Sequence, residues 1–161
     1  MSHSMNVAQP LGPKAGTASA TYTPAASSHT GLDSVGGAQT MTIPGSAGRI
    51  IKLTGYRFSI ATTTPVASVF TAFLYNSTPT VVADDDAYAV VAADGPSKFL
   101  GIVAIAQPTD FTSTWLESQG LIAGQYIQMV TDTLTVYLQL TTTATLEAVA
   151  HKLTLFYEIQ P

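Results

Sequence analysis

The strongest structural signal in this chain lies in residues 66–106, which read VASVFTAFLYNSTPTVVADDDAYAVVAADGPSKFLGIVAIA. Two apolar runs, Val69 to Tyr75 and Phe99 to Ile105, carry bulky side chains at both odd and even positions. Neighbouring side chains of a β-strand point to opposite faces, so neither face of such a strand suits water. We therefore predict that both runs form core strands.

The segment between these runs has the features of one short helix. Asp84 to Asp86 come first, a segment rich in Ala and Val follows from Ala87 to Ala93, and Asp94 to Pro96 end it. Asp accepts hydrogen bonds from the free N–H groups at the start of a helix, and Gly and Pro are common just beyond its end. We predict a helix over residues 87–93 with the acidic residues as its cap.

The acidic residues are also the densest group of candidate metal ligands. Calcium loops place carboxylates at alternating positions with a glycine at the turn, as in D-x-D-x-D-G, and Asp84 to Asp86 lack that spacing. Negative charge near a helix N-terminus is stabilising by ~0.3–1 kcal/mol, which gives these residues a structural purpose. His3, His29 and His151 have no second ligand at a metal-binding spacing. We predict no metal site and no cofactor.

The composition is that of a folded chain with few charges. Of the 161 residues, 46% are hydrophobic and only 10% are charged, which predicts one domain outside the disordered regime. A surface with few long ionic side chains suits contacts with other proteins. Six Lys and Arg residues and a net charge of −4 give no basic patch, so we expect no binding to nucleic acid or to anionic membranes. Without cysteine there are no disulfides and no Cys-based metal sites.

Residues 1–38 are rich in Ala, Ser, Thr, Gly and Pro. Such a segment has too few large apolar side chains to order itself, so we predict either a floppy tail or an extended arm that orders on a neighbouring subunit. Thr17 to Pro24 is the part best suited to pair as a strand. The start, MSHSMNVAQPLGPKAG, lacks the apolar core of a signal peptide, and no apolar run reaches the ~18 residues of a membrane helix, so we expect synthesis in the cytosol.

Residues 39–161 are predicted to form the folded domain. After a short strand over residues 39–43, a longer strand is predicted from Arg49 to Ala61. Its apolar positions change phase across Gly55, with these residues on the apolar side: Ile51 and Leu53 before the glycine, and Tyr56, Phe58 and Ile60 after it. A one-residue slip at a glycine is typical of a β-bulge, which keeps both halves of the strand facing one core.

Two strands near the C-terminus, Thr133 to Thr141 and Lys152 to Ile159, alternate apolar and polar residues with a period of two. One dry and one wetter face on each strand is typical of an antiparallel two-layer sandwich. Tyr137 and Phe156 stand on the wetter faces of these strands, which look hairpin-connected. We expect that face to be covered by the arm, a second sheet or another subunit.

The segment from Phe111 to Ala123 is predicted to be an irregular excursion, and it carries the only tryptophan, Trp115. With Phe111 and Tyr126 nearby, Trp115 either packs beneath its own loop or forms an aromatic platform for a sugar or a protein partner. The chain contains no G-x-S-x-G, S-x-x-K or H-E-x-x-H pattern and no glycine-rich phosphate loop. We therefore expect no enzymatic activity.

Roughly seven or eight strands with one helix predict the all-β class. We expect an antiparallel two-sheet sandwich, jelly-roll-like, with one short helix and an extended N-terminal arm. An immunoglobulin-like sandwich is the second candidate, although the Cys and Trp pattern of immunoglobulin domains is absent.

Four pieces of the central stretch form a pattern: Ala72 to Thr80, Asp84 to Tyr88, Asp94 with Lys98, and Phe99 to Ile105. These pieces resemble parts of small structural proteins of tailed bacteriophages. In order, they are an apolar strand ending in an LFxSNPT-like loop, acidic residues before A-(F/Y), an acidic residue shortly before Lys, and (L/V)LGxVxI. The Thr-rich final strands are similar to the end of such proteins. The resemblance covers the chain from Arg49 onward and leaves out the N-terminal segment.

The resemblance implies a virion protein of the capsid decoration, or cement, type, which is all-β, often trimeric and bound to the outside of the head lattice. Its implied partners are the major capsid protein and copies of itself. The alternative is a carbohydrate-binding β-sandwich module of a virion fibre or host-recognition protein. The side chains predicted to make protein contacts are Tyr22, Phe111, Trp115, Tyr137 and Phe156.

Overall fold

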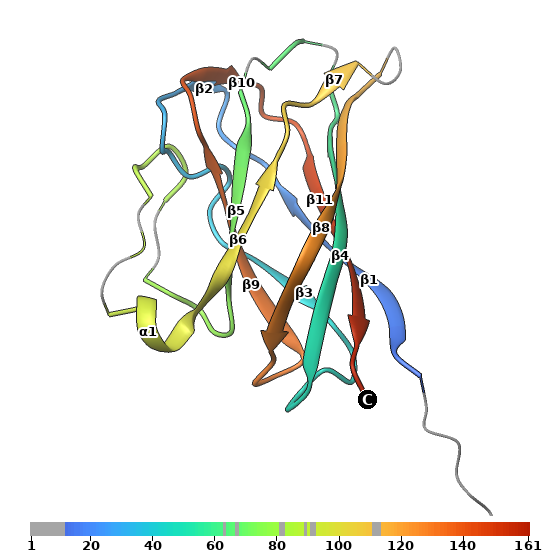
Figure 1. The fold of residues 1–161 in the computed structure, drawn as a ribbon. Helices are drawn as coiled ribbons and strands as arrows, with labels where there is room; N and C mark the ends of the chain where they lie inside the picture. Colours follow the sequence, from blue (N-terminus) through green and yellow to red (C-terminus); the bar gives the residue numbers. More distant parts are fainter. Residues whose placement is uncertain are drawn as a thin grey trace, which may run out of the picture.

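The computed structural model describes residues 12–62, 64–66, 68–80, 83–88, 90, 93–110 and 114–161. Over these residues the chain forms two antiparallel sheets that pack face to face, with a short helix beside them (Figure 1). The elements in chain order are β1 (Lys14–Tyr22), β2 (Ser27–His29), β3 (Gln39–Thr42), β4 (Ile50–Ile60), β5 (Phe70–Tyr75), α1 (Gly95–Lys98), β6 (Phe99–Ile105), β7 (Thr109–Asp110), β8 (Leu116–Gln128), β9 (Thr133–Leu140), β10 (Ala144–Leu146) and β11 (His151–Ile159). No helix in this part of the chain is long and apolar enough to cross a membrane.

The strand order is that of a jelly roll. Sheet I has the order β1-β11-β4-β8-β7, sheet II has the order β3-β9-β5-β6, and β10 pairs with β2. When the three shortest strands (β2, β7 and β10) are set aside and the other eight are numbered along the chain, sheet I reads 1-8-3-6 and sheet II reads 2-7-4-5. Two interlocked Greek keys give this order. The predicted all-β, jelly-roll-like antiparallel sandwich is confirmed.

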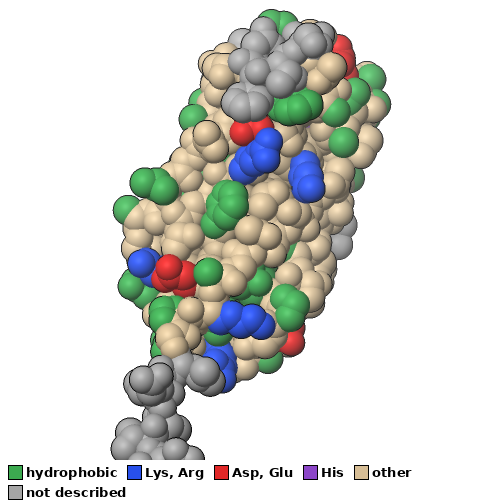
Figure 2. Space-filling model, turned by 90° about the vertical axis from the view of Figure 1, so that its right-hand side faces the viewer, with side chains coloured by type: hydrophobic (Ala, Val, Ile, Leu, Met, Phe, Trp, Pro, Cys, Tyr) green, Lys and Arg blue, Asp and Glu red, His purple; other side chains and the backbone are tan. Residues whose placement is uncertain are grey.

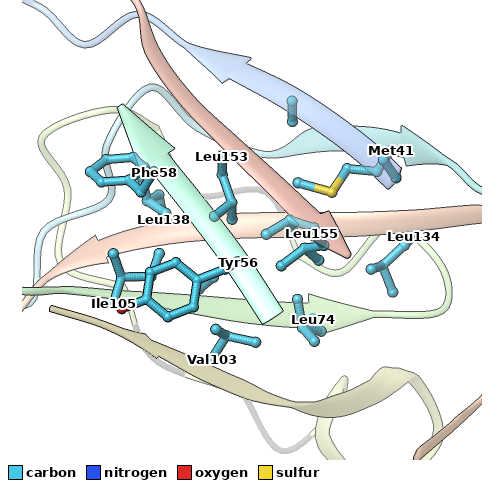
Figure 3. Close-up of a cluster of buried hydrophobic side chains, with 14 of the residues drawn as sticks. Met41, Tyr56, Phe58, Leu74, Val103, Ile105, Leu134, Leu138, Leu153 and Leu155 are labelled. Atoms are coloured by element: carbon cyan, nitrogen blue, oxygen red, sulfur yellow. The ribbon is translucent and has the colours of Figure 1, made fainter. Parts of the chain in front are cut away.

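The core lies between the two sheets and is filled by inward-facing side chains of both (Figure 3). The pairing of β4 with β8 shifts between Leu53 and Gly55, and the pairing of β11 with β4 shifts between Phe156 and Tyr157. Because of this shift, Leu53 and Tyr56 both point into the core, where each is at most 6% exposed. The β-bulge predicted at Gly55 is confirmed.

The two predicted core strands are confirmed as β5 and β6, which pair with each other in sheet II. No residue of β5 is exposed. Strand β6, however, lies at the edge of the sheet, and its Ile102 is 51% exposed. The expectation that both faces of residues 99–105 avoid water is wrong: Val103 and Ile105 are buried on the core face, but the opposite face, with Ile102 and Ala104, is left uncovered.

Strand β1 belongs to sheet I of its own chain. It pairs with β11 from Lys14 opposite Ile159 to Tyr22 opposite His151, across the predicted boundary at residue 39. The strand predicted around residues 17–24 is therefore present, but the arm that orders only on a neighbour is not confirmed. Small side chains are enough on the inner side of this strand, where Ala18 is 4% exposed.

Strand β9 is buried on both faces, contrary to the predicted wetter face. Tyr137 is fully buried, and its ring stacks on that of Tyr88 with the centroids 4.6 Å apart. Gln139 Nε2 donates hydrogen bonds to the carbonyl oxygens of Leu32 (3.1 Å) and Tyr88 (2.6 Å). The cover over Tyr137 thus comes from the N-terminal segment and from the turn that precedes Tyr88, and the arm is one of the three covers predicted for it.

The helix lies later in the chain than predicted. α1 spans Gly95–Lys98, with Pro in its first turn. Within the segment predicted to be helical, Ala87 instead forms an isolated bridge with Asp33, and the Tyr88 side chain is only 3% exposed. Residues 89, 91 and 92 of that segment lie outside the described residues. Proline suits the first turn because its missing N–H has no helical partner there, so Gly-Pro begins this helix and does not follow one.

Strand β8 occupies much of the segment predicted to be an irregular excursion. It pairs with β4 from Leu116 to Gln128. The chain then crosses to β9 in the other sheet, so Tyr137 of β9 and Phe156 of β11 lie in different sheets and their strands are not a hairpin. Glycines within the segment hid the strand, because glycine is depleted in strands.

Replacing Tyr22 by Ala tests whether β1 is part of the folded domain. The side chain is fully buried, and its hydroxyl donates to the Val136 carbonyl oxygen at 3.2 Å. Loss of a buried aromatic side chain should lower the free energy of unfolding by about 3–5 kcal/mol, seen as a lower midpoint in urea denaturation. Thr21→Ala, at an exposed position of β1, is the control and should change the midpoint little. Equal midpoints for Tyr22→Ala and wild type would contradict this placement of β1.

Candidate contact surface

The outer face of sheet I carries an open apolar groove beside the bulge of β4. The groove has a volume of about 480 Å³ and is lined by Thr54, Gly55, Tyr56, Gln119, Gly120, Leu121 and Phe156. These residues come from β4, β8 and β11, which lie side by side in the sheet. The bulge that orients the core strand therefore also shapes the surface behind it.

Two glycines form the floor of this groove. A side chain at position 55 would begin 2.9 Å from the Gly120 carbonyl oxygen and 3.6 Å from the Phe156 ring. A side chain at position 120 would begin 2.8 Å from the Tyr56 ring. Gly120 pairs with Tyr56, so a side chain there would collide with the Tyr56 ring on the core side of the sheet. Gly55 is on the outer face with Phe156, so its missing side chain is the one that keeps the groove open.

Leu121 forms the most exposed part of the rim. One residue separates Leu53 from Gly55 in β4, whereas three residues, 122–124, lie in the facing part of β8. The extra residues make β8 project from the sheet, and Gly124 takes a φ of +70°, which favours glycine. At the start of this projection Leu121 is 93% exposed.

The outer face of sheet I carries exposed apolar side chains both in the groove and outside it. Cross-strand partners share a face of a sheet, so Leu121 and Phe156 lie on the side of Gly55, and Tyr126 lies on the side of Lys52. Tyr126 is 58% exposed and Phe156 is 38% exposed. Contiguous exposed apolar side chains mark interaction sites on soluble proteins.

Two of the cations on this face are already paired with carboxylates. Lys52 Nζ lies 3.9 Å from Glu158 Oε2, and Arg57 Nη2 donates to Glu117 Oε2 at 2.6 Å. Figure 2 shows the molecule from this side, where neutral polar and hydrophobic side chains fill most of the surface between the charges. Such a face can be buried against another protein at a small electrostatic cost.

The five side chains predicted to make contacts have different positions. Phe156 lines the groove, and Trp115 is half-buried at a second hollow beside β4, so their contact roles stay predictions. Tyr22 and Tyr137 are fully buried inside the sandwich and its cover, so they have no surface to offer a partner. Phe111 lies outside the described residues.

Leu121 was not among the predicted contact residues. The sequence signal for it is weak: an apolar triplet, Leu121 to Ala123, stands between Gly120 and Gly124. Leu121 is exposed because β8 has three residues where the facing part of β4 has one, and only the pairing of the two strands shows this difference.

The acidic turn at residues 84–86 fastens the N-terminal segment over sheet II, and the described residues of the predicted helix after it are not helical. Asp84 Oδ2 accepts a hydrogen bond from the Ala25 N–H, and Oδ1 accepts one from the Gly36 N–H, both at 2.6 Å. His29 is fully buried, with Nε2 3.3 Å from Asp84 Oδ1 and Nδ1 3.8 Å from Asp85 Oδ1. We name these contacts the Asp84 clasp. No group of three or more His, Cys, Asp or Glu side chains within the described ranges is arranged to hold a metal ion.

The clasp lowers the pKa of the Asp84 carboxyl. Partial burial acts to raise this pKa, but the hydrogen bonds from Gly36 and Ala25 and the contact with His29 outweigh it, and the pKa lies below its usual 3.8. The folded state therefore favours the carboxylate. A carboxyl of this kind adds stability above its pKa in the unfolded chain and loses that contribution as the pH falls through its folded value.

Asp84→Asn should lower the free energy of unfolding at pH 7 and flatten its dependence on pH. The wild type should lose stability as the pH falls from about 5 to about 3, because protonation of Asp84 weakens the clasp, whereas the variant has no such charge to lose. Urea denaturation at several pH values measures both effects. Asp86→Asn removes the same charge from an exposed side chain of the same turn and is the matched control. Parallel curves for Asp84→Asn and wild type would contradict this role.

A scan against protein-family models finds no match to this chain, and a search of curated proteins finds no significant match either.

Proposed function

We propose that this chain is a bacteriophage capsid decoration, or cement, protein that binds the outer capsid lattice as a homo-oligomer and stabilises the head. The exposed apolar groove with its Leu121 rim carries this proposal, because it offers a neutral, hydrophobic surface on one face of a rigid sandwich. The resemblance of the central stretch to small phage structural proteins supports the same role. Its partners are further copies of the chain, with a trimer as the expected state, and the major capsid protein.

A capsid decoration protein needs a binding surface and no catalytic site. Burial of a fully exposed Leu side chain stabilises an interface by about 1.5–3 kcal/mol. In a symmetric oligomer each such contact recurs, and after one copy has bound the lattice the others bind at a high effective concentration. Weak single contacts therefore sum to firm attachment on a symmetric capsid site.

The fold is compatible with this proposal but does not carry it. Jelly rolls serve both in viral capsids and in lectins, so the architecture alone does not identify a function. The surface is more informative, since the groove, Leu121 and Tyr126 lie on the same face of one sheet.

Leu121→Asp should weaken self-association of the purified chain at least tenfold and shift it from oligomer to monomer. A charge placed at the centre of an apolar contact loses its hydration without gaining a partner. Size-exclusion chromatography with light scattering measures the molar mass, and co-sedimentation with empty phage heads measures lattice binding. The folding of the variant should be unchanged, because the side chain is 93% exposed.

Ile102→Asp is the matched control. Ile102 is also an exposed aliphatic residue on a strand, at 51%, but it lies at the edge of sheet II and does not line the groove. It should leave the oligomer intact. A wild-type chain that is monomeric and does not bind empty heads would refute the proposed function.

A further inference from the structure

A second hollow lies on the outer face of sheet I, further along β4 than the groove. It has a volume of about 380 Å³ and is lined by Arg57, Ser59, Ile60, Ala61, Trp115, Ala150, Lys152 and Thr154. This volume lies within the range of small-molecule sites, roughly 300–1,000 Å³. We name it the Trp115 hollow. It contains two types of group that the lining of the apolar groove lacks: cations and an indole ring.

The pairing of β11 with β4 brings its polar side chains together. Lys152 pairs with Ser59, and Thr154 pairs with Arg57, so these four side chains form two adjacent rows on one face of the sheet. The Thr154 hydroxyl is also within 2.8 Å of the Ser19 hydroxyl of β1. A ligand in the hollow would therefore meet hydroxyl groups and cations on neighbouring strands.

The two cations differ in how free they are. The Arg57 guanidinium is held at 2.6 Å by Glu117, whose side chain is only 5% exposed, so its position is fixed and its charge is partly neutralised. Lys152 is exposed, and within the described part of the chain its ammonium has no hydrogen bond or ion pair. The hollow thus combines two cations with one carboxylate, in a chain whose net charge is −4.

Trp115 adds an apolar surface beside this charge. Its ring comes from the residue just before β8, is half-buried, and lines the hollow together with Ala61 and Ala150. A pyranose ring has an apolar C–H face that packs on an aromatic ring and a rim of hydroxyls that hydrogen-bond to side chains. A carboxylate on such a ring would form a charge-assisted contact with a lysine ammonium.

We propose that the Trp115 hollow binds an acidic sugar. The sugar ring packs on Trp115, its carboxylate contacts Lys152 with Arg57 beside it, and its hydroxyls bond to Ser59 and Thr154. Neutral sugars make the ring contact only, so they bind more weakly. This inference does not depend on the capsid role, because it uses a different part of the face and a different kind of ligand.

The single tryptophan makes the binding directly observable. The full-length chain is titrated with oligogalacturonate, an acidic oligosaccharide, and in parallel with a neutral galactan oligosaccharide of the same length. The acidic probe should change the tryptophan emission in a saturable manner and bind at least tenfold more tightly than the neutral probe. Absence of a saturable change with the acidic probe, or equal binding of the two probes, would overturn the proposal.

Variants locate the site. Lys152→Gln should abolish the preference for the acidic probe, and because the side chain is exposed the variant should fold. Lys14→Gln removes the same charge from an exposed lysine at the opposite end of sheet I, and should leave the preference intact. An equal loss in both variants would show a non-specific effect of charge and refute the site. The molar mass of Lys152→Gln should equal that of wild type, which separates this test from the test of self-association.

Discussion

Strand β4 faces the core along its whole length only because its pairing shifts at Gly55. Without the shift, every side chain after the glycine, beginning with Tyr56, would point to the opposite face of the sheet. The same shift brings Gly55 close to Gly120 of β8, where neither position has room for a side chain. Behind this close approach lies the apolar groove. One backbone irregularity therefore serves both the core and the candidate contact surface.

The outer face of β9 in sheet II is covered by the chain itself, which distinguishes this strand from the strands of sheet I. The Asp84 clasp holds the N-terminal segment in place through Ala25, Gly36 and His29. Beneath this cover Tyr137 stacks on Tyr88, so the aromatic surface of β9 is satisfied within the chain. Sheet I has no comparable cover within the described residues, and Leu121, Tyr126 and Phe156 remain exposed on it.

The outer face of sheet I offers two surfaces of different chemistry along β4. Near the bulge it is apolar and built on glycines, with Leu121 projecting beside Phe156. Further along, Lys152 and Trp115 line a polar and partly cationic hollow. The two surfaces share no lining residue, because they occupy successive stretches of the same strand. One can therefore serve a protein contact and the other a small ligand.

Local sequence pattern was enough to predict the strands β3, β4, β5, β6, β9 and β11 and the bulge at Gly55. Continuous apolar runs predicted β5 and β6, and alternation with its change of phase predicted β4, β9 and β11, because both patterns are properties of consecutive residues. Tertiary structure alone revealed that β1 pairs with β11, that Tyr137 is covered, and that Leu121 projects from β8. These features depend on which distant segment supplies the other half of a buried surface. A strand with small side chains such as β1 looks unable to order itself until its neighbour is known, and the exposure of Leu121 follows from a count of residues in two strands far apart in the sequence.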